Sequence, residues 1–113
     1  MRQLKICPRP PETLARHHTE ETAARLALAA LPDPANLPPD LRAETFGPAA
    51  TRFLFSVARQ YEDRSLTFVE LVLAGRKAVL KSVAGWEKNP DKTRAGWSWW
   101  ARQGMLAAIA GEK

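Results

Sequence analysis

The stretch TFVELVLAGRKAVLKSV at positions 67–83 decides the fold class of this chain. Thr67 and Glu70 stand at its start with the spacing of a capping box, in which each side chain caps the backbone amide of the other residue. Apolar side chains then recur at helical intervals, and Gly85 follows as a typical helix end. The stretch therefore predicts a helix over 68–83.

A β-hairpin is the alternative for the same stretch. Its β-branched residues favour two strands, at 67–73 and 78–83, joined by a turn at 74–77. Apolar and polar residues do not alternate regularly, however, and the capping box favours the helix. The hairpin would change the fold class from all-α to α+β, and the sequence leaves it open.

The segments on either side have helical patterns of their own. Residues 48–63 carry an amphipathic pattern, and Asn89 followed by Pro90 marks the start of a helix over 90–110. With 68–83, these segments form a predicted three-helix unit. Its predicted core consists of Phe53, Leu54, Val57, Leu73, Leu80, Trp97, Trp100 and Met105.

The N-terminal part is predicted as an irregular arm at 1–10 and a helix over 12–31. Six prolines and glycines between 32 and 48 predict a Pro-rich linker, with a single helical turn possible at 40–44. The expected architecture is therefore all-α: a single four-helix domain over 1–113, in which the linker joins the N-terminal helix to the three-helix unit.

Residues 66–87 also resemble the phage-repressor type of DNA-binding helix-turn-helix. An LT..EL opening, a glycine turn at Gly75 and a terminal WE recur in that family, and all three elements occur here. The sequence departs from the family because Ala78, Val79 and Leu80 occupy positions where polar recognition residues are expected. We therefore assign the chain to no family.

The net charge of +5 is confined to one segment. Residues 1–75 are balanced in charge, whereas residues 76–102 hold seven basic and two acidic side chains and all four tryptophans. The basic residues are Arg76, Lys77, Lys81, Lys88, Lys92, Arg94 and Arg102. A basic patch interleaved with aromatic side chains is typical of proteins that bind an anionic partner.

Two functions fit this segment. The first is a small accessory or regulatory protein that binds DNA or RNA, in which the seven basic residues contact phosphates and Trp99, which points away from the predicted core, stacks on a base. The alternative is an adaptor or inhibitor that docks on a larger protein through the same surface. A homodimer that pairs through the N-terminal helix is also left open.

Other classes of function have little support. Cys7 is the single cysteine, so no internal disulfide can form, and His17 with Glu21 offers only two metal ligands of the usual three or four. The sequence has no Gly-rich phosphate loop and no Ser-His-Asp pattern. It also has no apolar run that could act as a secretory signal or a membrane span. We expect a cytoplasmic protein with no enzymatic activity, cofactor, metal or membrane partner.

Overall fold

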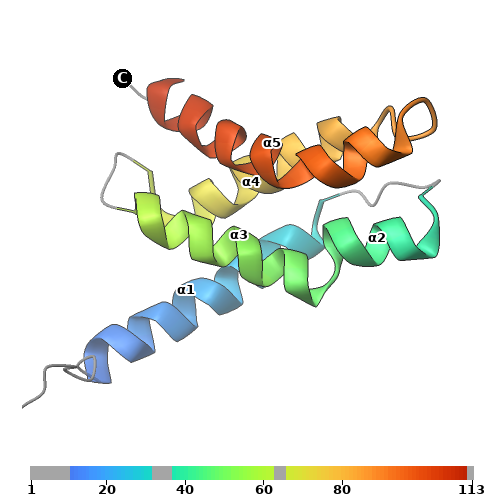
Figure 1. Ribbon diagram of the computed structural model, residues 1–113. Coiled ribbons are helices and arrows are strands. Elements are labelled where there is room, and N and C mark those ends of the chain that lie inside the picture. Colours follow the sequence, from blue (N-terminus) through green and yellow to red (C-terminus); the bar gives the residue numbers. More distant parts are fainter. Residues whose placement is uncertain (1–10, 32–36, 63–65, 112–113) are drawn as a thin grey trace, which may run out of the picture.

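The computed structural model describes residues 11–31, 37–62 and 66–111, so the predicted arm at 1–10, Cys7 and part of the predicted linker lie outside it. The described residues form helices and no strand, which confirms the all-α class (Figure 1). The helices are α1 (Pro11–Ala29), α2 (Pro39–Phe46), α3 (Pro48–Tyr61), α4 (Phe68–Val83) and α5 (Pro90–Gly111).

Helix α4 decides between the two alternatives for residues 67–83. The Thr67 hydroxyl accepts a hydrogen bond from the Glu70 amide at 3.2 Å, and the Glu70 carboxylate accepts one from the Thr67 amide at 2.9 Å. The predicted capping box is thus confirmed, and the hairpin alternative is wrong. Gly75 lies inside the helix, so the turn of a helix-turn-helix is absent at this position in the described chain.

Helix α2 lies within the segment predicted as a linker, which adds a two-turn helix to the expected four. Pro39 occupies its first turn, and Pro48 begins α3 directly after Gly47. The Leu41 side chain is fully buried, and Leu37 and Phe46 are partly buried against the core. The Pro-rich segment therefore packs on the rest of the protein as well as connecting two helices.

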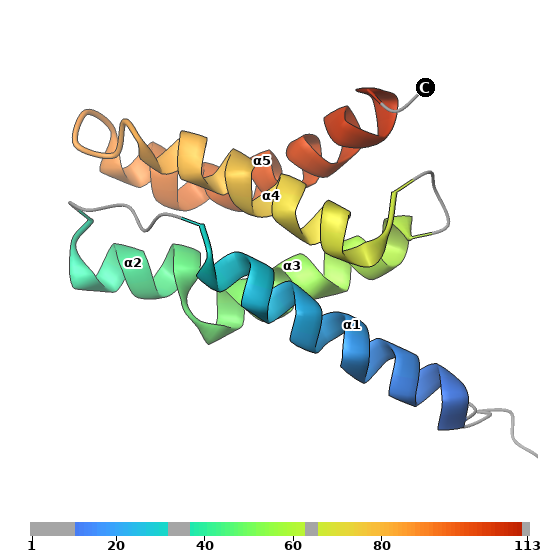
Figure 2. The ribbon, with the colours of Figure 1, turned by 180° about the vertical axis from the view of Figure 1, so that it is seen from behind.

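The helices form two layers. Helices α4 and α5 lie side by side and antiparallel, and α1, α2 and α3 lie on one side of this pair (Figures 1 and 2). The core between the layers is filled by α3, α4 and α5, with Ala24 contributed by α1. Its fully buried side chains include Leu54, Val57, Phe68, Leu71, Val72, Val79, Ala101 and Met105.

The predicted core is partly correct. Leu54, Val57 and Met105 are buried, and the other predicted members except Trp100 are partly buried. Trp100 is 49% exposed, so its assignment to the core is wrong. The buried residues of α5 are Thr93, Ala101, Met105 and Ile109, which form one stripe along the helix, and Trp100 lies about 100° away from the middle of this stripe.

Candidate functional site

Arg76 does not lie on the surface with the other predicted phosphate-binding residues. It is only 8% exposed and contributes to the buried face of α4. Its guanidinium carbon lies 4.9 Å from the centre of the Phe46 ring, and its Nη2 donates a hydrogen bond to Thr51 Oγ1 at 3.3 Å. Arg76 therefore links α4 to α2 and α3 and belongs to the structure of the fold.

Arg94 and Arg102 are also engaged within the protein. Arg94 donates hydrogen bonds to Asp40 at 2.7 Å and to Glu44 at 3.2 Å, which ties α5 to α2. The hydrogen bond from Arg94 lowers the pKa of the Asp40 carboxyl, and the same bond raises the pKa of Arg94. Arg102 donates a hydrogen bond to Gln60 at 3.3 Å, with its guanidinium carbon 5.7 Å from the centre of the Phe53 ring.

The four lysines of the basic segment remain exposed. Lys77 and Lys81 lie one turn apart on α4, Lys88 lies in the turn that follows α4, and Lys92 lies in the first turn of α5. None of them forms an ion pair with another residue in the described part of the chain. The accessible positive charge of the segment thus comes mainly from lysine.

The same segment also has two exposed tryptophans, both on α5. Trp99 is 55% exposed, in agreement with its predicted position off the core, and Trp100 is exposed as well. Their ring centres are 5.0 Å apart and the planes meet at 83°, so the edge of one ring faces the other ring. Trp97, by contrast, is partly buried and packs edge-on against Phe53 at 5.4 Å.

Two of the exposed lysines and both exposed tryptophans border a groove between α4 and α5, with a volume of about 820 Å³. Its surface is mainly apolar, because alanine and tryptophan side chains form much of its lining. Its lining includes Lys77, Ala78, Lys81, Trp99, Trp100 and Gly104. A smaller hollow of about 200 Å³ adjoins it at Trp100 and extends to Lys92. We call these two hollows together the α4–α5 groove.

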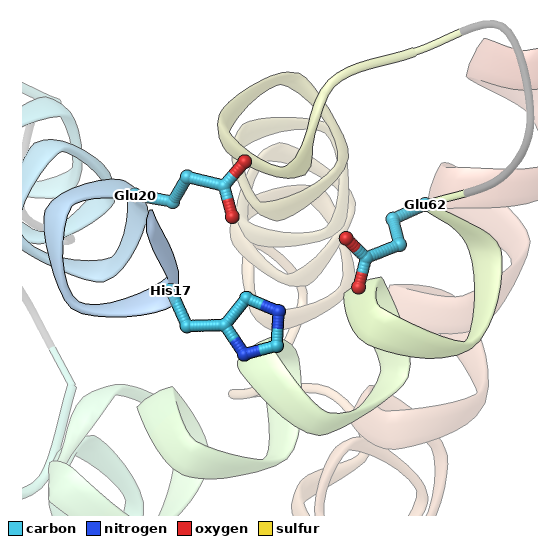
Figure 3. Close-up of side chains that lie close together, drawn as sticks. All are labelled: His17, Glu20 and Glu62. Atoms are coloured by element: carbon cyan, nitrogen blue, oxygen red, sulfur yellow. The ribbon is translucent and has the colours of Figure 1, made fainter. Parts of the chain in front are cut away.

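A second cluster lies at the contact of α1 with α3. Ligand atoms of His17, Glu20 and Glu62 lie within 4.8 Å of one another (Figure 3). Glu21, which the sequence paired with His17, instead approaches Arg59 at 3.6 Å. A histidine and two carboxylates are ligands that divalent metals accept.

The cluster is better explained by Arg59 of α3. Its Nη1 donates a hydrogen bond to Glu20 at 2.8 Å and pairs with Glu62 at 3.3 Å. Its Nη2 donates a hydrogen bond to the His17 carbonyl oxygen at 3.4 Å. The guanidinium thus already neutralises both carboxylates, and the arrangement is an ion-pair network that joins α1 to α3.

The sequence pattern identified Lys77, Lys81 and Trp99 but missed the groove that they border. Trp100 had been assigned to the core, and Ala78 had no assigned role. A signal was present in the small residues Ala74, Ala78 and Gly104, because small residues on facing helices permit close approach of the backbones. These small residues predict a groove only when it is known that α4 and α5 pack against each other.

No protein-family model matches the chain, and no solved structure matches it. In the described part of the chain, no helix combines the length and the apolar character that crossing a membrane requires.

Proposed function

We propose that this chain is a small adaptor or inhibitor, without enzymatic activity of its own, that docks on a larger protein through the α4–α5 groove. The observation that carries this proposal is the pair of exposed tryptophans, Trp99 and Trp100, beside a mainly apolar groove. Tryptophan supplies much of the binding energy in protein interfaces, where it buries a large apolar area. An exposed apolar surface edged by polar residues is typical of such interfaces.

The arrangement of the groove favours a protein partner over a nucleic acid. Single-stranded nucleic acids bind by stacking successive bases on aromatic faces. Trp99 and Trp100 are nearly perpendicular, so two neighbouring parallel bases cannot stack on both rings. The arginines, which make the most specific contacts to phosphates and bases, are engaged in contacts within the fold.

Binding to DNA or RNA is the second candidate, and the four exposed lysines are the observation that favours it. Engagement of about four phosphates gives a salt slope near −3.6 on duplex DNA and near −2.8 on a single strand. A protein partner held mainly by the tryptophans gives a much weaker dependence on salt. The two candidates therefore differ in a measurable way.

Photo-crosslinking in the source cells tests the proposal. A photoreactive amino acid is placed at Ala107, which is exposed and lines the groove, and a matched control carries it at Ala95, which is exposed outside the groove. We expect the Ala107 position alone to crosslink to a specific protein. That protein, once purified, should bind the wild-type chain, and Trp99→Ala should weaken its binding at least tenfold.

The same experiment can contradict the proposal. Crosslinks from Ala107 to DNA or RNA, with binding that depends steeply on salt, would establish the second candidate instead. Equal crosslinking from Ala95 and Ala107, or binding that Trp99→Ala leaves unchanged, would show that the α4–α5 groove is not the interface. Leu26→Ala is the control for loss of an exposed apolar side chain elsewhere, because Leu26 is exposed on α1.

A further inference from the structure

We infer that the occupant of the α4–α5 groove is an acidic amphipathic helix of the partner protein. This inference rests on the proposed function and specifies the chemistry of the partner. It depends on three properties of the groove: its backbone chemistry, its dimensions and its charge.

The backbone chemistry of the groove favours a helix over an extended peptide. Extended peptides usually bind by adding a strand to a sheet edge, where main-chain groups supply the hydrogen bonds. The groove walls are α4 and α5, whose amides and carbonyls bond within each helix. An extended peptide would leave its own backbone groups without partners there, whereas a helix satisfies them internally.

The dimensions of the groove suit a helix of about three turns. Its lining on α4 runs from Ala74 to Ser82, about 12 Å at 1.5 Å per residue, and its lining on α5 runs from Lys92 to Ala107, about 22 Å. A helix of three turns, about 16 Å long, lies between these two lengths. The contact between Ala78 and Gly104 forms the floor of the groove, so large side chains of a partner helix can pack on these two small residues. Leucine, isoleucine or phenylalanine at positions i, i+4 and i+7 of the partner would fill this space, flanked by Trp99 and Trp100.

The charge of the groove specifies an acidic helix. Lys77 and Lys81 are spaced by one turn along the α4 side, and Lys92 lies at the adjoining hollow. Asp or Glu residues spaced by four on a partner helix can therefore face Lys77 and Lys81 together. The lysines also attract an acidic partner over a longer range and disfavour a basic helix.

A display library of helical peptides tests this inference on the full chain. The peptides are about 18 residues long, carry apolar residues at i, i+4, i+7 and i+11, and vary freely between Glu, Lys, Gln and Ser at the flanking positions. We expect Glu to be enriched at the flanks. The consensus peptide, measured by fluorescence anisotropy, should bind the wild-type protein at least tenfold more tightly than the same peptide with Lys for Glu.

Two variants locate the binding site of that consensus peptide. Ala107→Trp fills the groove from an exposed position and should weaken binding at least tenfold, whereas Ala95→Trp should not. The double variant Lys77→Glu and Lys81→Glu should reverse the preference, so that the Lys peptide binds more tightly than the Glu peptide. Circular dichroism of each variant confirms that the helices are intact.

Three outcomes would overturn the inference: no enriched peptide, enrichment without a preference for Glu, or binding that Ala107→Trp leaves unchanged. If a natural protein still crosslinks from Ala107 in any of these cases, the proposed docking function stands and only the helical, acidic nature of the occupant is wrong. A dimer in light scattering that Ala107→Trp dissociates would instead assign the groove to a second copy of this chain.

Discussion

Gly104 of α5 lies directly against Ala78 of α4. A methyl group added at Gly104 would lie 2.5 Å from the Cβ of Ala78 and 2.9 Å from the carbonyl oxygen of Ala74. Neither atom belongs to the end of a flexible side chain, so neither can move aside without a shift of α4. This contact brings the two helices together beneath the groove.

We expect Gly104→Ala to destabilise the protein. The helix propensity of alanine favours the change by about 1 kcal/mol, but overpacking in a close helix contact costs about 1–3 kcal/mol and should exceed it. The free energy of unfolding, measured by urea denaturation followed by circular dichroism, should therefore fall. Gly96→Ala is the control in the same helix, because its nearest atom outside the helix backbone, Trp100 Cδ1, is 3.9 Å away. That control should gain up to about 1 kcal/mol, and equal effects of the two changes would contradict the close approach.

Arg59 should contribute strongly to the packing of α1. Its guanidinium carbon lies 3.8 Å from the centre of the Phe68 ring, and its side chain is only 18% exposed while it pairs with Glu20. Arg59→Met keeps much of the aliphatic length but leaves neighbouring carboxylates without their cation. We expect a loss of about 1–3 kcal/mol in the free energy of unfolding, and faster hydrogen exchange in α1 than in α4.

Arg52→Met is the matched control for Arg59→Met, because Arg52 is exposed on the same helix. It should change the free energy of unfolding by less than about 0.5 kcal/mol. Arg59→Lys should recover only part of the loss, since lysine keeps the charge but not the planar group that stacks on Phe68. Identical stability of the Arg52 and Arg59 variants would show that the ion-pair network does not hold α1.

The helices could be predicted because their signals are local. The capping box of Thr67 and Glu70 and the proline starts of α1 and α5 lie within a few residues of the helix ends that they specify. Helix α2 could not be predicted with the same assurance, because long-range contacts stabilise it. Asp40 and Glu44 bond to Arg94, more than 45 residues further along the chain.

The candidate site could be predicted only in part, because it too depends on contacts between residues far apart in the sequence. A count of charges treats arginine and lysine alike, and only the folded chain shows that Arg76, Arg94 and Arg102 are engaged by α2 and α3. The apolar residues of α5 cover a broad face of the helix, and Trp100 lies at the edge of this face, where a side chain can be either buried or exposed. Its true position depends on the facing helix, which the pattern of α5 does not contain.

Arg76 and Lys77 should differ sharply although they are adjacent and carry the same charge. Arg76→Ala removes a buried side chain that contacts Phe46 and Thr51, so we expect a loss of about 1–3 kcal/mol in the free energy of unfolding. Lys77→Ala alters an exposed position and should change stability by less than about 0.5 kcal/mol. Denaturation of both variants checks this, and a stability loss for Lys77→Ala equal to that for Arg76→Ala would contradict it.

Acid should weaken the link between α2 and α5. The hydrogen bond from Arg94 lowers the pKa of Asp40 in the folded protein, so the link is fully present above the ordinary carboxyl pKa of about 4. It is lost as the pH falls below that value and through the lowered pKa. The pKa of Glu70 is lowered by its hydrogen bond from the Thr67 amide, and this group acts with the same sign. The free energy of unfolding should therefore fall between about pH 5 and pH 3.

Asp40→Asn tests the contribution of that carboxylate. The variant cannot form the charged pair, so it should be less stable than the wild type at pH 7, and the difference should narrow as the pH approaches 3. Glu87→Gln is the control, because Glu87 is exposed and forms no ion pair with another residue in the described ranges. It should leave the free energy of unfolding at pH 7 close to that of the wild type, because it alters an exposed position. A constant difference between Asp40→Asn and the wild type from pH 7 to pH 3 would show that the Asp40–Arg94 bond contributes nothing to the acid sensitivity.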